Sequence, residues 1–97
     1  MKVVWTRKAY TRLAEIEDYI ATDAPERACS FVSELIDRAD TLAKFSEAGR
    51  LVPEDSERLR RELIHEGYRI IYRIEDNAVY ILSVFEGSRL TRDDDFK

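Results

Sequence analysis

The stretch RLRRELIHEGYRIIYR, residues 58–73, decides the fold, because its second half alternates between two kinds of side chain. Alternation with a period of two residues predicts a β-strand with two different faces. One face carries aromatic and aliphatic residues, namely Tyr68, Ile70, Tyr72 and Ile74. The other face carries Arg69 and Arg73. Since guanidinium groups bind carboxylates and phosphates through a fixed fork of donors, this second face predicts contact with an anionic partner.

The residues around this stretch predict a meander of three antiparallel strands. Turn residues at Glu66-Gly67 and Asp76-Asn77 separate them. The predicted strands are Leu59 to Glu66, Tyr68 to Glu75 and Ala78 to Glu86. In the last strand, simple alternation gives two apolar sets on opposite faces, which are Val79, Ile81 and Phe85 on one and Tyr80, Leu82 and Val84 on the other. Because both faces are apolar, this strand is predicted to lie in the centre of the sheet.

The first half of the chain predicts one strand and two helices. Lys2 to Trp5 is a short apolar strand, and Thr6 can cap the helix that periodicity predicts from Arg7 to Ala21. Pro25 suits the first position of a second helix, which is predicted to run to about Ser46. Because only a few residues join the two helices, they should form an antiparallel hairpin.

The connection from the helices to the meander begins at Gly49, which is predicted to supply the left-handed conformation that often ends a helix. The resulting order is β-α-α-β-β-β, an α+β fold. In this fold the helical hairpin packs on one face of a small antiparallel sheet, and the opposite face is expected to be open. The tail SRLTRDDDFK, residues 88–97, is predicted to be short helix or coil.

The composition predicts one globular domain over residues 1–97. The net charge of −4 and the pI near 5.0 do not fit a protein that binds nucleic acid by itself. No segment has the roughly 20 apolar residues of a membrane-spanning helix, and the N-terminus lacks the apolar part of a secretory signal. One cysteine cannot form an internal disulfide, which agrees with a reducing compartment. The expected location is therefore the cytoplasm, away from membranes.

Few side chains suit metal or nucleophilic chemistry. One histidine and one cysteine at unrelated spacing cannot form a zinc site without an improbable set of carboxylates, so neither a metal site nor a cofactor is predicted. His65 could act as a general base, but a histidine beside a hairpin turn is more often a partly exposed strand residue.

The arginines allow two interpretations. They could converge across neighbouring strands into a cationic surface, formed by Arg60, Arg69, Arg73 and Arg89. They could instead form cross-strand ion pairs with acidic residues of the same strands, which are Glu62, Glu75 and Glu86. Spacing alone leaves both interpretations open.

Four segments, together with the order of elements, resemble the RelE/ParE superfamily of bacterial toxins. The segments read GR-x-VPE (residues 49–54), R-x-R-R-E-L-I (58–64), YRIIYRI (68–74) and V-x-x-G-x-R (84–89). The resemblance implies the toxin of a two-gene type II toxin-antitoxin module, held silent by a cognate antitoxin. It also implies one of two activities. RelE-like members cut mRNA in the ribosomal A site, whereas ParE-like members inhibit DNA gyrase.

The residues at the superfamily's functional positions favour the ParE-like branch. By resemblance, Arg69 and Arg89 match arginines that could stabilise a phosphate in a nuclease. The positions where RelE nucleases carry lysines hold Arg60 and Glu62, and Glu86 stands where many relatives have a histidine. The general acid or base of the nuclease is therefore missing. A net charge of −4 also opposes entry into ribosomal RNA.

The predicted function is thus a ParE-like toxin that inhibits DNA gyrase by binding and is not an enzyme. The predicted partner-binding residues are Arg50, Arg58, Arg60, Arg69, Arg73 and Arg89. The alternative is a RelE-like ribosome-dependent endoribonuclease that uses Arg60, Arg69 and Arg89, in which Arg69→Ala should abolish cutting without unfolding the domain. A third interpretation is an inactive family member that retains antitoxin binding or regulation.

Overall fold

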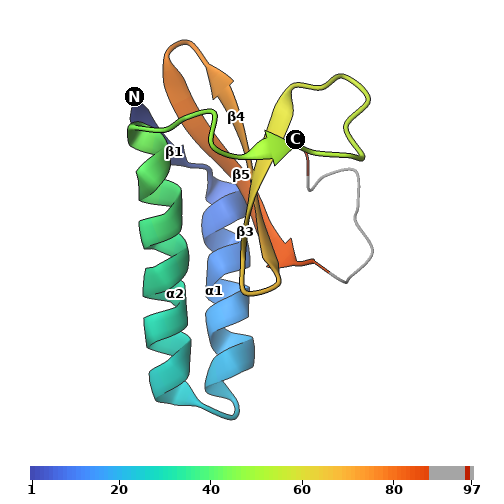
Figure 1. Ribbon diagram of the computed structural model, residues 1–97. Coiled ribbons are helices and arrows are strands. Elements are labelled where there is room, and N and C mark those ends of the chain that lie inside the picture. Colours follow the sequence, from blue (N-terminus) through green and yellow to red (C-terminus); the bar gives the residue numbers. More distant parts are fainter. Residues whose placement is uncertain (88–95, 97) are drawn as a thin grey trace.

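Two helices lie side by side and pack against a five-stranded sheet (Figure 1). The computed structural model describes residues 1–87 and residue 96. Its elements are β1 (Lys2–Trp5), α1 (Arg7–Ala21), α2 (Pro25–Asp40), the 3₁₀ helix η1 (Thr41–Ala43), β2 (Arg50–Leu51), β3 (Arg60–His65), β4 (Tyr68–Glu75) and β5 (Ala78–Glu86). The predicted order of elements is confirmed, with the two-residue strand β2 as an addition.

The strands follow the order β1-β5-β4-β3-β2 across the sheet. β3, β4 and β5 form the predicted antiparallel meander. β1 pairs with β5 in parallel, with Lys2 opposite Ala78 and Trp5 opposite Ile81, so the sheet is mixed rather than wholly antiparallel. The helical hairpin lies within the long crossover connection that parallel neighbours require. This pairing places β5 between β1 and β4, as its two apolar faces predicted.

Capping and periodicity explain α1. The hydroxyl of Thr6 accepts a hydrogen bond from the backbone N–H of Ala9 at 3.2 Å and donates one to the carbonyl of Ile81 at 2.7 Å. The cap therefore also ties the start of α1 to β5. The buried residues of α1, namely Ala9, Leu13 and Ile16, recur at helical spacing. In the described part of the chain, neither helix is long and apolar enough to cross a lipid bilayer.

The second helix begins at Pro25 as predicted but ends at Asp40, before the predicted Ser46. Residues 41–43 tighten into η1. The hydroxyl of Thr41 donates to the carbonyl of Arg38 at 2.6 Å and so satisfies one of the free carbonyls at the helix end.

Gly49 is required for a different reason from the predicted one. In the described part of the chain, Gly67 is the glycine with a positive φ, at 83°, and Gly49 has none. A Cβ on Gly49 would lie 2.6 Å from the carbonyl oxygen of Glu62 and 2.7 Å from the hydroxyl of Tyr72. The prediction of a left-handed Gly49 is therefore wrong, because it is close approach, not backbone twist, that excludes a side chain there.

A β-bulge at Leu82 exchanges the faces of two residues in β5. The pairing of β4 with β5 shifts by one position there, so Leu82 has no partner on β4. The extra residue reverses the alternation beyond it. Val84 consequently joins the core under the helices, and Phe85 joins Leu82 on the opposite face. The faces predicted for Val84 and Phe85 by simple alternation are therefore wrong.

The face turned away from the helices, called the far face below, carries a small apolar cluster of its own. Its members are Val52, Ile71, Leu82 and Phe85, with Tyr80 and Phe96 packed against them. Val52 comes from the segment that follows β2, so this connection covers part of the face. The expectation that the far face is open is therefore wrong for this part of the sheet.

Candidate functional site

The far face also brings together the arginines of β3 and β4. Arg60 on β3 lies directly opposite Arg73 on β4, and Glu62 lies opposite Ile71. Like charges directly opposite each other are destabilising, so such a face needs acidic partners. They come from β3 and β4 and from the loop between β2 and β3.

Arg69 is the centre of this ion-pair network. Its Nη1 and Nη2 each donate to an oxygen of Glu54 at 2.8 Å, and its Nε donates to Oε1 of Glu62 at 2.6 Å. Its guanidinium carbon lies 5.3 Å from the ring centroid of Phe85. Arg69 is only 8% exposed, and its hydrogen bonds, those to Glu54 first, raise its pKa. It is a permanent, largely buried cation, each of whose three nitrogens already donates a hydrogen bond to a carboxylate.

Glu62 links Arg69 to Arg50. Its Oε2 accepts a hydrogen bond from Nε of Arg50 at 2.5 Å, while Oε1 faces Arg69. Glu62 is 1% exposed, whereas the side chain of Arg50 is 61% exposed. The carboxylate is thus buried between two guanidinium groups that occupy both of its oxygens. This arrangement leaves Glu62 no free oxygen with which to act as a base.

Asp55 organises the loop between β2 and β3. Its carboxylate accepts the backbone N–H groups of Glu57, Leu59 and Arg60 at 3.1, 2.9 and 2.8 Å. Desolvation would raise the pKa of Asp55, but these backbone hydrogen bonds lower it overall. Nη1 of Arg60 lies 3.5 Å from Asp55, and its Nε donates to the carbonyl of Phe96 at 2.6 Å. Asp55 therefore fixes both the loop that carries Glu54 and the side chain of Arg60.

The remaining predicted arginines differ in their surroundings. Arg73 pairs with Glu75 at 2.8 Å, and its guanidinium lies 5.3 Å from the ring centroid of Tyr80. Arg58, with a φ of 59°, is exposed, and within the described residues its side chain has no ion-pair partner. Arg89 lies outside the described residues. Both interpretations of the arginines hold in part, because Arg60, Arg69 and Arg73 share the far face and each lies beside an acidic group.

Some of these acids were predictable from the sequence and others were not. Glu62 pairs with Arg69 across β3 and β4, as predicted, whereas Glu75 pairs with Arg73 of its own strand and not across strands. Glu54 and Asp55 lie in a loop, where no periodicity indicates a partner. The one signal for them is their position, two acids directly after Pro53 and just before an arginine-rich strand.

Acid should weaken this network. Hydrogen bonds from Arg69, acting against desolvation, hold the pKa of Glu54 below its ordinary value of 4.5. A carboxylate with a lower pKa in the folded state stabilises the fold above its unfolded-state pKa, and this contribution is lost as pH falls. We therefore expect the melting temperature to decrease below pH 4.5 more steeply in the wild type than in Glu54→Gln. Circular dichroism melting curves at several acidic pH values check this, and parallel decreases would contradict it.

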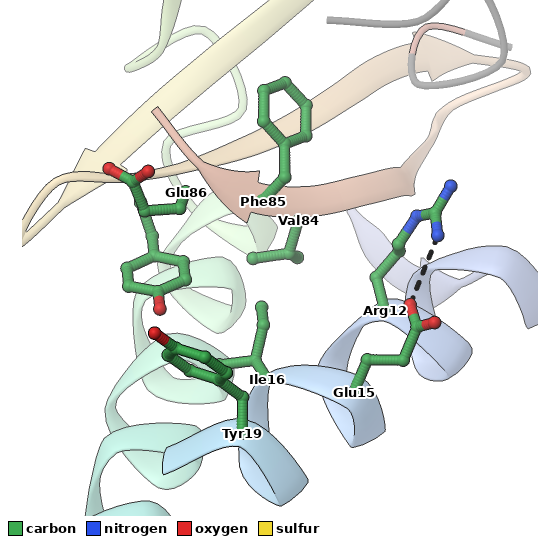
Figure 2. Close-up of a pocket in the computed structure, with 8 residues that line it drawn as sticks. Arg12, Glu15, Ile16, Tyr19, Val84, Phe85 and Glu86 are labelled. Carbon is green, nitrogen blue, oxygen red and sulfur yellow. Dashed lines mark hydrogen bonds and ion pairs between the residues drawn. The ribbon is translucent and has the colours of Figure 1, made fainter. Parts of the chain in front are cut away.

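A separate pocket of about 350 Å³ lies between α1 and the ends of β4 and β5. Figure 2 shows Ile16 and Tyr19 of α1 on one side of it and Val84 of β5 on the other. Arg12 and Glu15 pair at its rim, 3.2 Å apart. Tyr19 is 77% exposed although it borders this apolar hollow. An exposed aromatic side chain beside an apolar pocket is typical of a surface that receives a partner's side chain.

A cluster of polar side chains, apart from the arginine network and the pocket, lies between α2 and the turn that joins β3 to β4. It consists of Glu34, His65 and Glu66, which within the described residues form a group that could hold a metal ion. His65 is a partly exposed strand residue, as predicted, with 20% of its side chain exposed. It lies on the helix side of the sheet and takes no part in the arginine network.

Comparison with known proteins assigns the chain to a family. The family model described as "ParE toxin of type II toxin-antitoxin system, parDE" matches residues 3–91. The chain belongs to this ParE toxin family. It is therefore a toxin of a type II toxin-antitoxin system, and the predicted membership of the RelE/ParE superfamily is confirmed.

This ParE-family toxin is similar to proteins that carry both superfamily names. It is 35% identical over 89 residues to Toxin RelE2 of Caulobacter vibrioides, which covers 92% of this chain and 98% of that protein. A solved chromosomal ParDE toxin-antitoxin system from P. aeruginosa matches with a TM-score of 0.78 and 26% identity, covering 89% of this chain and 95% of the other. The RelBE2 toxin-antitoxin complex of Mycobacterium tuberculosis shares the fold, with a TM-score of 0.65 and 21% identity over 88% of this chain and 95% of the other. Similarity to these proteins does not distinguish gyrase from the ribosome as the target, so the geometry of the site must be used to choose between them.

Proposed function

We propose that this ParE-family toxin inhibits DNA gyrase by binding to it and makes or breaks no bond itself. The observation that carries this proposal is the neutralised state of Arg60 and Arg69, the two described arginines at the nuclease positions. A nuclease needs such groups to stabilise the charge that develops on a phosphate. Here Arg69 already binds Glu54 and Glu62, and Arg60 lies beside Asp55. A phosphate would have to displace carboxylates that the fold holds in place, which supports binding rather than cutting.

We place the contact with gyrase at the accessible arginines of the far face and its border, Arg50, Arg58 and Arg73. Their guanidinium groups can reach a partner. Arg60 and Arg69 are less accessible and contribute indirectly, because they fix the loop between β2 and β3 and the pairing of β3 with β4. Arginine is enriched at protein interfaces, because its rigid fork binds acidic groups at little conformational cost. Arg89, outside the described residues, stays a predicted contact residue.

A cognate antitoxin should neutralise the toxin, and we propose that it docks in the pocket beside α1. The similar structure from P. aeruginosa is that of a ParDE toxin-antitoxin system, which supports an antitoxin partner. An apolar antitoxin side chain could fill the hollow between Ile16, Tyr19 and Val84. The residues that line the pocket do not include Arg50, Arg58 or Arg73, so the antitoxin contact and the target contact can be altered independently.

An assay with purified gyrase tests the proposal. We expect the toxin to inhibit the supercoiling of relaxed plasmid and to leave mRNA intact in a reconstituted translation reaction. Adding the antitoxin encoded beside the toxin gene should restore supercoiling. Cleavage of mRNA on the ribosome, with supercoiling unaffected, would instead establish the endoribonuclease activity.

Two substitutions should separate the proposed surfaces within this same assay. Arg58→Glu should weaken gyrase inhibition about tenfold, equivalent to about 1.4 kcal/mol, and leave antitoxin binding unchanged. Tyr19→Ala should weaken antitoxin binding and leave gyrase inhibition unchanged. Arg7→Glu is the matched control, because it reverses another exposed charge at the start of α1. Equal effects of Arg58→Glu and Arg7→Glu would show that net charge matters and that the proposed contact surface is wrong.

The 35% identity to a protein named Toxin RelE2 favours a second candidate, a ribosome-dependent endoribonuclease that uses Arg60, Arg69 and Arg89. The contacts of Arg69 mean that Arg69→Ala cannot test this candidate as predicted from the sequence. Because Arg69 neutralises the buried Glu62, its removal should destabilise the domain, so loss of cutting would not identify a catalytic group. If the chain is instead an inactive relative, its expression without an antitoxin should leave cell growth unaffected.

A further inference from the structure

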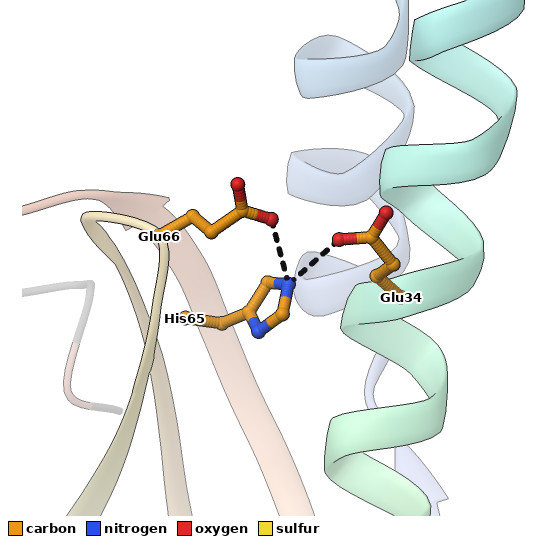
Figure 3. A group of neighbouring side chains, drawn as sticks. All are labelled: Glu34, His65 and Glu66. Carbon is orange, nitrogen blue, oxygen red and sulfur yellow. Dashed lines mark hydrogen bonds and ion pairs between the residues drawn. The ribbon is translucent and has the colours of Figure 1, made fainter.

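Three potential metal ligands from two distant parts of the chain meet at one point. Glu34 lies in α2, His65 ends β3, and Glu66 begins the turn to β4. Figure 3 shows the imidazole of His65 between the two carboxylates. Nε2 of His65 lies 3.0 Å from Oε1 of Glu34 and 3.2 Å from Oε2 of Glu66. One potential ligand atom from each residue therefore lies within 4.8 Å of the other two.

The two separations that involve His65 are close to those between neighbouring ligand atoms of a coordinated transition metal. Bond lengths of about 2.0–2.2 Å from zinc to nitrogen and oxygen, in tetrahedral geometry, put neighbouring ligand atoms about 3.4 Å apart. The two contacts of His65 are within a few tenths of an ångström of that spacing. One imidazole and two carboxylates suit Zn²⁺ and similar divalent ions, and three protein ligands leave a position for water.

Arg27 binds both carboxylates, and at Glu34 it leaves the oxygen that faces His65. Its Nη1 donates to Oε2 of Glu34 at 2.7 Å, which leaves Oε1 of Glu34 directed at His65. Its Nη2 lies 3.2–3.3 Å from the two oxygens of Glu66. The guanidinium is itself held over the ring of Phe31, 5.0 Å from its centroid. At Glu34 the guanidinium therefore binds the oxygen away from His65, as groups that fix the geometry of metal ligands do, whereas at Glu66 a metal ion would have to replace the contact of Arg27 with Oε2.

We propose that Glu34, His65 and Glu66 form a binding site for a divalent transition-metal ion of the Zn²⁺ class, which would join α2 to the β3–β4 turn. The sequence predicted no metal site, because one histidine needs carboxylates to complete a ligand set. The fold supplies those carboxylates. The proposal does not depend on the target of the toxin, since these residues belong neither to the far-face arginines nor to the pocket beside α1.

Because His65 is the one histidine of the chain, its imidazole signals in proton NMR need no assignment by mutation. After treatment of the full chain with EDTA, addition of ZnCl₂ should shift these signals and raise the melting temperature by several degrees. MgCl₂ at the same concentration should do neither, because Mg²⁺ prefers an octahedral shell of oxygens. Isothermal titration calorimetry should give one zinc ion per chain.

Matched variants locate the binding. His65→Gln and Glu66→Gln should each weaken zinc binding at least tenfold, whereas Glu57→Gln, which alters an exposed carboxylate elsewhere, should not. Cys29→Ser should also retain affinity, which excludes binding through the exposed thiol on α2. Melting curves of each variant without zinc show whether it is folded. Unshifted His65 signals in excess ZnCl₂, or equal affinity in His65→Gln, would overturn the proposal and leave a histidine that only pairs with two carboxylates.

Discussion

Replacing Glu62 with alanine should destabilise the toxin by about 3–5 kcal/mol, the usual cost of removing one partner from a buried ion pair. The substitution leaves Arg69 with Glu54 alone and removes the acceptor of Arg50. Since the free energy of unfolding of domains is about 5–15 kcal/mol, this loss is a large fraction of the total stability. Urea denaturation followed by circular dichroism measures the loss.

Two further variants show whether burial is the cause. Glu57→Ala removes a carboxylate whose side chain is 66% exposed and lies 3.5 Å from Arg60, so it should cost no more than about 1 kcal/mol. Glu62→Gln keeps the size of the side chain but loses its charge and should fall between the two. If Glu62→Ala costs no more than Glu57→Ala, the network does not stabilise the far face.

Gly49→Ala should cost about 3 kcal/mol or more, because it both overpacks the core and disturbs a buried hydrogen bond. The added methyl group would lie 2.6 Å from the carbonyl oxygen of Glu62 and 2.7 Å from the ring and hydroxyl of Tyr72. That hydroxyl accepts the backbone N–H of Gly49 at 2.9 Å and donates to the carbonyl of Ser46 at 2.8 Å. The same denaturation assay gives the loss.

Gly67 provides a control that distinguishes steric overlap from backbone strain. Gly67 has a φ of 83° and open space where an added methyl group would lie, so Gly67→Ala should cost only the strain of the left-handed region, about 1–2 kcal/mol. Tyr72→Phe removes one of the atoms that Gly49→Ala would contact, so the double variant should be less destabilised than the sum of the two singles. Additive losses would mean that the methyl group and the hydroxyl do not meet.

Periodicity in the sequence was sufficient to predict those helices and strands whose surroundings repeat regularly along their length. The apolar stripe of α1 and the alternation of β4 each repeat the same environment along the element, so local spacing carries the information. The bounds of α1, β4 and β5 agree with the prediction for this reason. The charged alternation of β4 also predicted correctly that Arg69 and Arg73 share a face.

The features that escaped prediction depend on contacts between distant residues. The bulge at Leu82 becomes evident only once β4 and β5 are paired, because no residue type marks it. Glu54 reaches Arg69 through the path of a loop, and Glu34 reaches His65 through the packing of α2. Spacing rules do not extend across such connections. The acidic residues Glu54 and Glu34 were therefore harder to predict as partners than the basic residues that they bind.

The hydrogen bond from Thr6 to Ile81 spans 75 positions, and within the described sheet β5 is the neighbour of β1. At a translation rate of about 5–20 residues per second, the first strand waits about 4–15 s before its neighbour exists. The helical hairpin, whose contacts are local, can form in that interval, but the sheet closes only after β5 has been made. An interrupted translation product therefore leaves its helices without a sheet to cover and becomes a substrate for proteases. Toxicity is therefore expected only after β5 has been synthesised.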